Sequence, residues 1–229
     1  MDPSQDFFWQ SGNSDSGSDD AWIQWFCRQK GNEFFCEVDP SYIDDPFNLT
    51  GLSACVPHYS TALDILLDCA TQTIEGYDDD TAAELNEAAT LLYGLIHARF
   101  ILTGAGLTAM KAKYETRDFG TCTCYFCDNQ PLLPIALSDS VGRDSVKLYC
   151  ASCKDIYKPK QARFRQIDGA FFTTSFPHMF YLQFPHYLPS TEIPQYQPKI
   201  FGFRIREHYD SKDSTEDEVV PPSKHLLTH

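Results

Sequence analysis

The sequence has no long hydrophobic run and few basic residues. Its richest apolar stretch, from Leu91 to Leu102, is interrupted by Gly94, His97 and Arg99, which makes it unsuitable for spanning a bilayer. The first twenty residues are acidic and rich in Ser and Gly, and lack the basic start and apolar segment of a signal peptide. We therefore expect a soluble, intracellular protein without a membrane partner.

The sequence also lacks the residue sets that catalysis requires. The tripeptide Asp-Phe-Gly at 118–120 occurs in protein kinases, but a kinase also needs a Gly-rich loop, a strand lysine and a catalytic loop with a base Asp. None of these is found, so we interpret the tripeptide as a hinge between two regions. No spacing ties the dispersed histidines to a Ser or Cys nucleophile: His58, His97, His178 and His186. We expect no enzymatic activity.

Charge is unevenly distributed along the chain. The chain has 18 Lys and Arg residues and 32 Asp and Glu residues, which gives a net charge of −14. Most of the acidic excess lies in residues 1–118, whereas residues 119–207 are mildly basic. This asymmetry indicates two regions with different partners, and the overall acidity disfavours nucleic acid as one of them.

Composition changes divide the chain into five stretches and predict an α+β fold. Residues 1–20 form a disordered, acidic, Ser-rich terminus, and 21–118 form an all-helical domain. Residues 119–175 contain Gly, Pro, Cys and short apolar runs, which predict a region of short strands and tight turns instead of helices. Residues 176–207 are rich in proline and aromatics and are predicted to be mostly extended, and 208–229 form a disordered acidic tail.

Local signals place the helices of the second stretch. Pro40 and Pro57 each stand at a plausible first helical position. Thr81 and Glu84 have the spacing of a capping box in front of a strongly amphipathic pattern. Thr103 is predicted to cap the last helix. In the β region, short strands are expected from the apolar runs at 131–137, 146–149 and 170–172.

Five of the nine cysteines fall between Cys122 and Cys153. Cys150 and Cys153 form one C-x-x-C pair, and 22 residues separate it from an upstream group of three cysteines. Two cysteine pairs at this separation are typical of a structural four-thiolate zinc site without an open position for substrate. Spacing alone allows either Cys122 or Cys124 to join Cys127, and the alternative is a set of buried or redox-active thiols without an ion.

Metal has an energetic role in this interpretation. A segment of about 35 residues is shorter than the roughly 40 residues at which a domain normally folds unaided. Structural zinc contributes roughly 10–16 kcal/mol, so we expect metal to decide whether this region folds. The remaining cysteines are scattered among apolar residues and are expected to be ordinary thiols: Cys27, Cys36, Cys55 and Cys69.

A basic stretch follows the last cysteine, and its role is open between two interpretations. It could attract phosphate or an acidic protein surface, or it could be a merely solvated strand edge. The stretch has one acid, Asp155, and five basic residues: Lys154, Lys158, Lys160, Arg163 and Arg165.

Ile200, Phe201 and Phe203 are candidate partner-binding residues. In an extended segment Phe201 and Phe203 face the same way, which suits an anchor in a partner groove, although both rings could equally pack on their own domain. Candidate phosphorylation sites occur in both termini. Ser16, Ser214 and Thr215 each have an acid three residues later, which suits a kinase that prefers acidic substrates; a solubilising tail is the alternative.

Several longer stretches together resemble the regulatory (beta) subunit family of casein kinase II. The resemblance covers about residues 21–207 in one order and includes Trp-Ile-Gln-Trp-Phe-Cys at 22–27, Phe-Asn-Leu-Thr-Gly-Leu at 47–52, Leu-Tyr-Gly-Leu-Ile-His-Ala-Arg at 92–99, Val-Lys-Leu-Tyr-Cys at 146–150 and Phe-Gly-Phe at 201–203. It implies an all-helical N-terminal domain, a small zinc-ribbon-like antiparallel β domain at 119–175 through which the chain forms a homodimer, and an extended segment at 176–207 that binds the catalytic subunit. The zinc-stabilised homodimer would be located in cytoplasm and nucleus, bind two catalytic (alpha) subunits and tune their stability and their choice of protein substrates.

The resemblance also implies roles for particular residues. The zinc ligands would be Cys122, Cys127, Cys150 and Cys153, and the family usually lacks a cysteine at the position of Cys124. Phe201 and Phe203 match the aromatic pair that enters the catalytic subunit. The autophosphorylated serines of the family would correspond loosely to Ser14, Ser16 and Ser18.

Departures from the family pattern suggest a divergent paralogue. The family usually has Cys-Pro-Arg where this chain has Cys-Thr-Cys at 122–124, its dense acidic loop is reduced to Glu75 and residues 78–80, and Ser60 replaces the Arg of its Arg-x-x-Leu box. Two alternatives therefore accompany the main interpretation. One is a zinc-ribbon protein that binds nucleic acid, and the other is a paralogue that dimerises without engaging the kinase.

Overall fold

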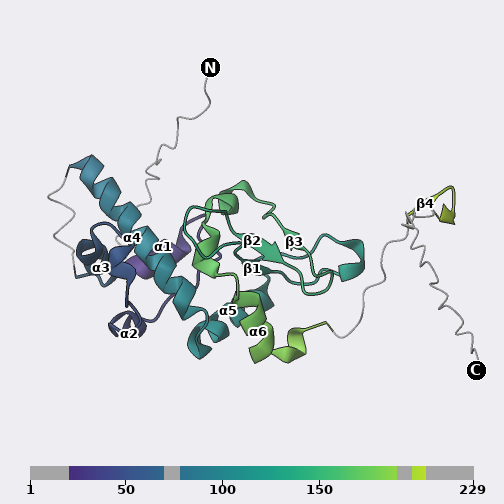
Figure 1. Ribbon diagram of the computed structural model, residues 1–229, viewed down its shortest axis with the longest axis horizontal. Coiled ribbons are helices and arrows are strands. Elements are labelled where there is room, and N and C mark those ends of the chain that lie inside the picture. Colours follow the sequence, from purple (N-terminus) through teal and green to yellow (C-terminus); the bar gives the residue numbers. More distant parts are fainter. Residues whose placement is uncertain (1–20, 70–77, 190–197, 205–229) are drawn as a thin grey trace, which may run out of the picture. The chain divides into compact units, whose positions relative to one another are not determined.

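A computed structural model describes residues 21–69, 78–189 and 198–204 of the chain (Figure 1). Residues up to Ile193 form one compact unit and residues from Pro194 form a second, so each unit is described by itself. The first unit contains helices followed by a small antiparallel sheet, which confirms the predicted α+β class. The domain boundaries proposed from composition stay predictions.

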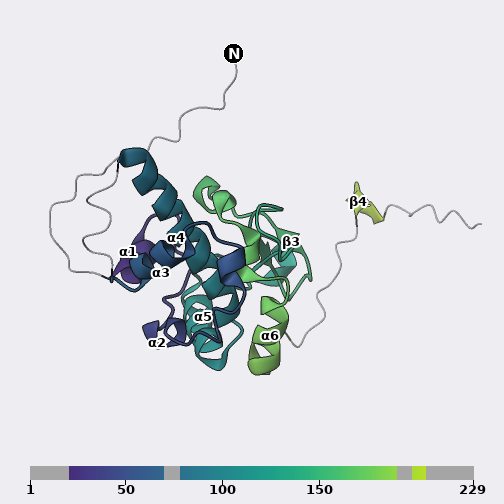
Figure 2. The ribbon, with the colours of Figure 1, turned by 60° about the vertical axis from the view of Figure 1, so that its left-hand side comes forward.

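The first half of this unit is helical. Its helices are α1 (Trp22–Arg28), α2 (Pro40–Ile43), α3 (Tyr59–Leu66), α4 (Asp79–Phe100) and α5 (Gly104–Thr116), with a 3₁₀ turn η1 (Leu52–Ala54) between α2 and α3. In Figure 2, α4 lies between α1–α3 on one side and the later, green segments on the other. Among the described residues no single helix is long and apolar enough to cross a membrane, although α4 and α5 together, bent by 98°, meet that length and composition.

Two helices begin where the sequence predicted. Pro40 occupies the first turn of α2, where Asp39 accepts a hydrogen bond from the Ser41 N–H at 2.9 Å. Thr103 caps α5 by accepting from the Gly106 N–H at 3.1 Å.

Two other helix starts differ from the prediction. Helix α3 begins at Tyr59 instead of Pro57, because His58 adopts a left-handed conformation that cannot belong to the helix. The capping box at Thr81 was wrong, since α4 begins at Asp79 after Asp78 and Thr81 already lies inside its first turn.

The second half of the unit contains a three-stranded antiparallel sheet in the order β1-β2-β3. Strand β1 (Leu133–Ile135) pairs with β2 (Lys147–Tyr149), which pairs with β3 (Ile156–Tyr157). The 3₁₀ turns η4 (Ala162–Gln166) and η5 (Gly169–Phe172) follow. The predicted strand at 170–172 is therefore wrong.

The prediction of a mostly extended segment from residue 176 was also wrong. Helix α6 (Phe176–Gln183) and the 3₁₀ turn η6 (Pro185–Tyr187) occupy its first part. Pro177 stands in the first turn of α6, where proline is tolerated. Phe176 and Phe180 are buried at a spacing of one helical turn, a pattern that the surrounding aromatic residues had hidden in the sequence.

Helices and sheet share one hydrophobic core. Phe34, which precedes α2, stacks on Phe164 of η4 with ring centroids 4.1 Å apart and meets the edge of Phe172 in η5. Leu133 and Leu148 of the sheet belong to the same buried cluster as the residues of α4. The cysteine-rich segment thus does not have to build a core alone, contrary to the expectation from its length.

Helix α4 and η5 approach each other closely at Gly94. A Cβ atom on Gly94 would lie 2.4 Å from the Phe171 ring, well inside van der Waals contact. His97, one turn further along and fully buried, has its ring Nδ1 2.9 Å from the Phe171 carbonyl oxygen. Because a carbonyl only accepts, Nδ1 carries the proton, and Nε2 accepts from the Cys36 N–H at 3.2 Å. The neutral imidazole therefore forms a hydrogen bond with the Phe171 carbonyl and another with the Cys36 N–H.

We predict that Gly94→Ala destabilises the protein by about 1–3 kcal/mol, because the added methyl group overpacks the contact with Phe171. Gly104→Ala is the matched control: it also replaces a helical glycine, but nothing lies within 4 Å of the place where its methyl group would stand. The control should be neutral or slightly stabilising. Urea unfolding of both variants measures the difference, and equal free energies of unfolding would contradict the packing argument.

The stability of the protein should also depend on pH through His97. Burial lowers the pKa of this imidazole from 6.5 to about 4. Between these values the unfolded chain takes up a proton that the folded chain refuses, so stability falls as pH falls from about 6.5 to about 4, by about 3 kcal/mol in total.

Urea unfolding between pH 4 and 7.5 tests this dependence. His97→Gln should lose this part of the pH dependence, whereas the exposed His186→Gln should retain it. A wild-type profile parallel to that of His97→Gln would show that His97 does not contribute.

Candidate metal centre

The first cysteine group lies in a loop after α5 that turns back on itself. The Cys122 N–H donates to the Gln130 carbonyl at 2.8 Å and closes the base of the loop. The 3₁₀ turn η3 (Tyr125–Cys127) lies inside it, and the next two residues, Asp128 and Asn129, both have positive φ. Such residues tolerate left-handed backbone and allow the sharp reversal.

The second group lies in the turn between β2 and β3. The Lys154 N–H donates to the Cys150 carbonyl at 2.9 Å, and Lys154 has a φ of 60°. The Cys150 N–H in turn donates to the Asp155 carbonyl at 3.0 Å. These bonds fold the C-x-x-C segment into a knuckle that directs the sulfurs of Cys150 and Cys153 toward the first loop.

The structure brings the sulfurs of Cys122, Cys127, Cys150 and Cys153 within 4.8 Å of one another. The Cys122 and Cys153 sulfurs are 3.8 Å apart, and the Cys127 and Cys150 sulfurs are 3.9 Å apart. Tetrahedral zinc with Zn–S bonds of about 2.3 Å requires S–S separations of about 3.8 Å. The four thiols therefore fit a zinc ion with very little rearrangement.

Cys124 does not belong to this group of four. Its backbone N–H instead donates to the Cys122 sulfur at 3.4 Å, and the Tyr157 hydroxyl lies 3.1 Å from the Cys153 sulfur. Contacts of this kind orient ligating sulfurs and stabilise their negative charge. Of the two candidates that spacing left open, the structure places Cys122 among the four sulfurs.

Burial affects the protonation of these thiols. It raises the pKa of Cys150 to about 12 and also raises the pKa of Cys127. At Cys153 burial acts in the same direction, but hydrogen bonds from Tyr157 and from backbone outweigh it and lower the pKa. A metal that binds thiolates must therefore displace protons, and its affinity must fall as the pH falls.

The other four cysteines are separate from the cluster. The Cys27 sulfur lies 3.2 Å from the Tyr93 hydroxyl, and Cys36 is buried beside His97. Cys55 and Cys69 are exposed. In the described part of the chain none of them joins a group that could hold a metal.

Comparison with known proteins identifies the family. Residues 21–204 match the family model described as casein kinase II regulatory subunit. The chain is 49% identical to casein kinase II subunit beta' of Drosophila melanogaster over 81% of its own length and 84% of the relative's. It is 48% identical to casein kinase II subunit beta of Schizosaccharomyces pombe, over 86% and 84% of the two lengths.

The chain belongs to the casein kinase II regulatory subunit family. The predicted resemblance is thereby confirmed, and so is the prediction of a non-catalytic chain, because the family is regulatory.

In this family member the Asp-Phe-Gly tripeptide is structural. The Asp118 carboxylate accepts from the Thr116 hydroxyl at 2.8 Å and lies 3.4 Å from the Lys113 ammonium group. Phe119 is buried against the edge of Phe34. The tripeptide thus closes α5 and anchors the start of the cysteine loop to the core.

The basic stretch after the cysteines is partly engaged within the protein. Arg163 forms an ion pair with Glu33 at 2.9 Å, and the Arg165 guanidinium donates to the Pro159 carbonyl at 2.8 Å. Lys154, Lys158 and Lys160 are exposed. Both arginines therefore have structural partners, which favours the solvated-edge interpretation over a phosphate site.

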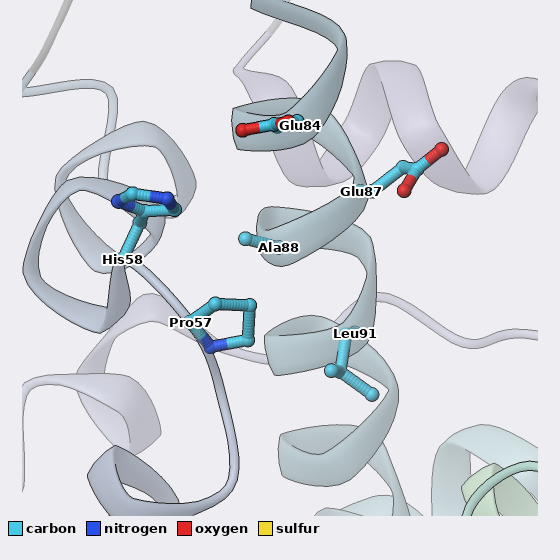
Figure 3. Close-up of a pocket in the computed structure, with 6 residues that line it drawn as sticks. All are labelled: Pro57, His58, Glu84, Glu87, Ala88 and Leu91. Carbon is cyan, nitrogen blue, oxygen red and sulfur yellow. The ribbon is translucent and has the colours of Figure 1, made fainter. Parts of the chain in front are cut away.

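One hollow in the helical half was not predicted from sequence. It has a volume of about 420 Å³ and lies between Pro57 and His58, which precede α3, and the part of α4 from Glu84 to Leu91. In Figure 3, Ala88 faces His58 and Pro57 across it, while the Glu87 carboxylate points away from them. The hollow contains no cysteine and none of the predicted site residues.

The candidate partner-binding residues form a hairpin in the second unit. Strand β4 (Lys199–Ile200) pairs with β5 (Phe203–Arg204), so Ile200 and Phe203 are cross-strand partners. Phe201 and Gly202 form the two-residue turn, and both have positive φ, as in a type I′ turn. The predicted continuous extended segment with both rings on one face is thus wrong, because the turn separates Phe201 from Phe203.

All three apolar side chains of the hairpin are exposed: Ile200 by 56%, Phe201 by 96% and Phe203 by 79%. The candidate phosphorylation sites lie outside the described residues: Ser14, Ser16, Ser18, Ser214 and Thr215.

Replacing ligands should separate the two candidate cysteines. We predict that Cys122→Ser and Cys150→Ser lose bound zinc, because each removes one of four sulfurs, whereas Cys124→Ser retains about one zinc per chain. Atomic emission on gel-filtered protein measures the ratio. A Cys124→Ser protein without zinc, alongside a zinc-loaded Cys122→Ser protein, would reverse the assignment.

Proposed function

We propose that this regulatory subunit forms a zinc-stabilised homodimer that docks two casein kinase II catalytic subunits and modulates their stability and substrate choice. The observation that carries the proposal is the group of four sulfurs at zinc-like separations, in a chain whose family is regulatory. A closed four-thiolate site leaves no position for substrate, so a zinc ion there would be structural.

Exposed apolar side chains beside the sulfur cluster support dimerisation through this region. Tyr125 in the first cysteine loop is 91% exposed, and Phe126 and Ile156 are also exposed. Ile156 lies on β3, which is an edge strand of the three-stranded sheet. An exposed edge strand with neighbouring apolar side chains favours pairing with another chain, and two metal-ordered loops would hold this surface in a fixed shape.

The exposed hairpin supports the docking of a kinase catalytic subunit. Its apolar side chains project from a short, two-stranded element, and aromatic anchors of this kind often dominate binding energy. The relatives that this chain resembles are named as casein kinase II subunits, which makes the catalytic subunit the partner that we propose. This subunit would then contact protein substrates as part of its complex with the catalytic subunit.

Regulation and location complete the proposal. Acidic residues follow Ser16, Ser214 and Thr215, which suits phosphorylation by an acid-directed kinase such as the proposed partner. The nine cysteines are free thiols, which suits the reducing cytoplasm and nucleus. A nucleic-acid-binding zinc ribbon has less support, because the net charge is −14 and both arginines of the basic stretch are engaged.

The hairpin assignment predicts that Phe201→Ala together with Phe203→Ala weakens binding to the catalytic subunit by about 30-fold or more, from the loss of about 2 kcal/mol or more. Phe47→Ala is the control, since Phe47 is also an exposed aromatic residue but lies in the helical half. Calorimetric titration with purified catalytic subunit gives the dissociation constants.

Two results would contradict parts of the proposal. Unchanged affinity in the double variant, with zinc content and dimer intact, would remove the anchor role of the hairpin. A wild-type dimer that elutes separately from the catalytic subunit in gel filtration would instead identify a paralogue that no longer engages the kinase.

A further inference from the structure

Cys124 and Cys127 in the first cysteine loop form a second C-x-x-C pair. Only Cys127 of this pair belongs to the group of four sulfurs. Cys124 immediately precedes η3, and Cys127 ends it. The Cys127 N–H donates to the Cys124 carbonyl at 3.1 Å, so the four residues form one tight turn. In such a turn the first and fourth Cα atoms are less than about 7 Å apart, and disulfides span Cα separations of about 4.4–6.8 Å.

The backbone holds the two cysteines at the ends of one turn. Cys124 also lies against the sulfur group, since its N–H donates to the Cys122 sulfur at 3.4 Å. Cys127 is one of the four clustered sulfurs, whereas Cys124 is outside that group. A bond between them would close a ring within this one turn, and none of its four residues belongs to a strand of the sheet.

The loop exposes the two sulfurs unequally. Cys127 is buried and Cys124 is only partly buried. Tyr125 and Phe126, which lie between them, are both exposed. Cys122, Cys127 and Cys150 are buried, so a small oxidant in solution reaches Cys124 more readily than these three sulfurs. Cys153 is partly buried like Cys124, but it belongs to the group of four that would bind the metal, whereas Cys124 would have no bond to metal that protects it.

We propose that Cys124 is a redox-modification site, which forms a reversible disulfide with Cys127 and thereby withdraws one sulfur from the metal. This inference rests on the proposed zinc-binding function. The oxidant is a peroxide, a class of molecule that oxidises accessible cysteines inside cells. The disulfide leaves three sulfurs in place, and a structural zinc site with three protein ligands is open to solvent and loses its ion more readily.

The chemistry balances in two steps. Hydrogen peroxide oxidises the Cys124 thiol to a sulfenic acid and is itself reduced to water. The Cys127 thiolate then attacks the Cys124 sulfur and expels hydroxide, which takes up a proton and leaves as a second water. Two thiol groups are thus converted to one disulfide for each peroxide consumed, and a dithiol reductant reverses the change.

The test uses the full, zinc-loaded chain treated with hydrogen peroxide. Released zinc is followed with a chromogenic chelator, and alkylation with mass mapping identifies the oxidised pair. The wild-type chain should release zinc at least about tenfold faster than Cys124→Ser and Cys124→Ala, and should contain a Cys124–Cys127 disulfide. Dithiothreitol with added zinc should restore the metal. Cys55→Ser, which removes an exposed thiol outside the loop, should behave as wild type.

Other outcomes would overturn the inference. Equal release rates in the wild type and both Cys124 variants would exclude a role for Cys124, and so would a disulfide between any other pair. These results are distinct from a failure of the proposed function, which would appear as a wild-type chain without zinc before any peroxide is added.

Discussion

The close contact between α4 and η5 joins the two halves of the first unit. Gly94 allows the Phe171 ring to lie against the helix, and His97 binds the Phe171 carbonyl one turn later. Through this contact the amphipathic face of α4 and the residues around the sheet enter one buried cluster. The cysteine loops therefore start from a rigid base: Phe119 is buried at the beginning of the first loop, and Leu148 is buried in the strand that leads to the second.

This shared base changes the energetic role of a bound metal. A free-standing segment of this length would depend on zinc for its entire fold. Here the sheet is supported by buried aromatic residues of the helical half, such as Phe34. A metal would instead order the two turns that carry the sulfurs, along with Tyr125 and Ile156 on the surface beside them. Only these two turns and the surface beside them would then depend on the metal. A change at the metal site would therefore alter that surface and leave the rest of the unit folded.

Features with a strong local signal were predictable from sequence. The apolar spacing of α4 and the cap at Thr103 depend on neighbours within one or two turns, and the cysteine pairs imply a metal site through their chemistry. Spacing could not decide between Cys122 and Cys124, because the choice depends on which side chain points toward a turn from a distant part of the chain. Helix α6 was missed because its buried positions and its exposed Leu182 are equally apolar, which removes the contrast on which helical periodicity depends.

The turn of the hairpin places an aromatic residue where the backbone disfavours one. Phe201 has a φ of 49°, a region in which Asn, Asp and Gly are preferred and in which a bulky side chain is strained. Gly202 meets the same requirement without strain. Local folding therefore explains the glycine and leaves the phenylalanine unexplained. Phe201 is nearly fully exposed as well as unfavourable for its own turn, so it adds little to the stability of the free hairpin. Strain and exposure together are what the docking role that we propose for this residue requires.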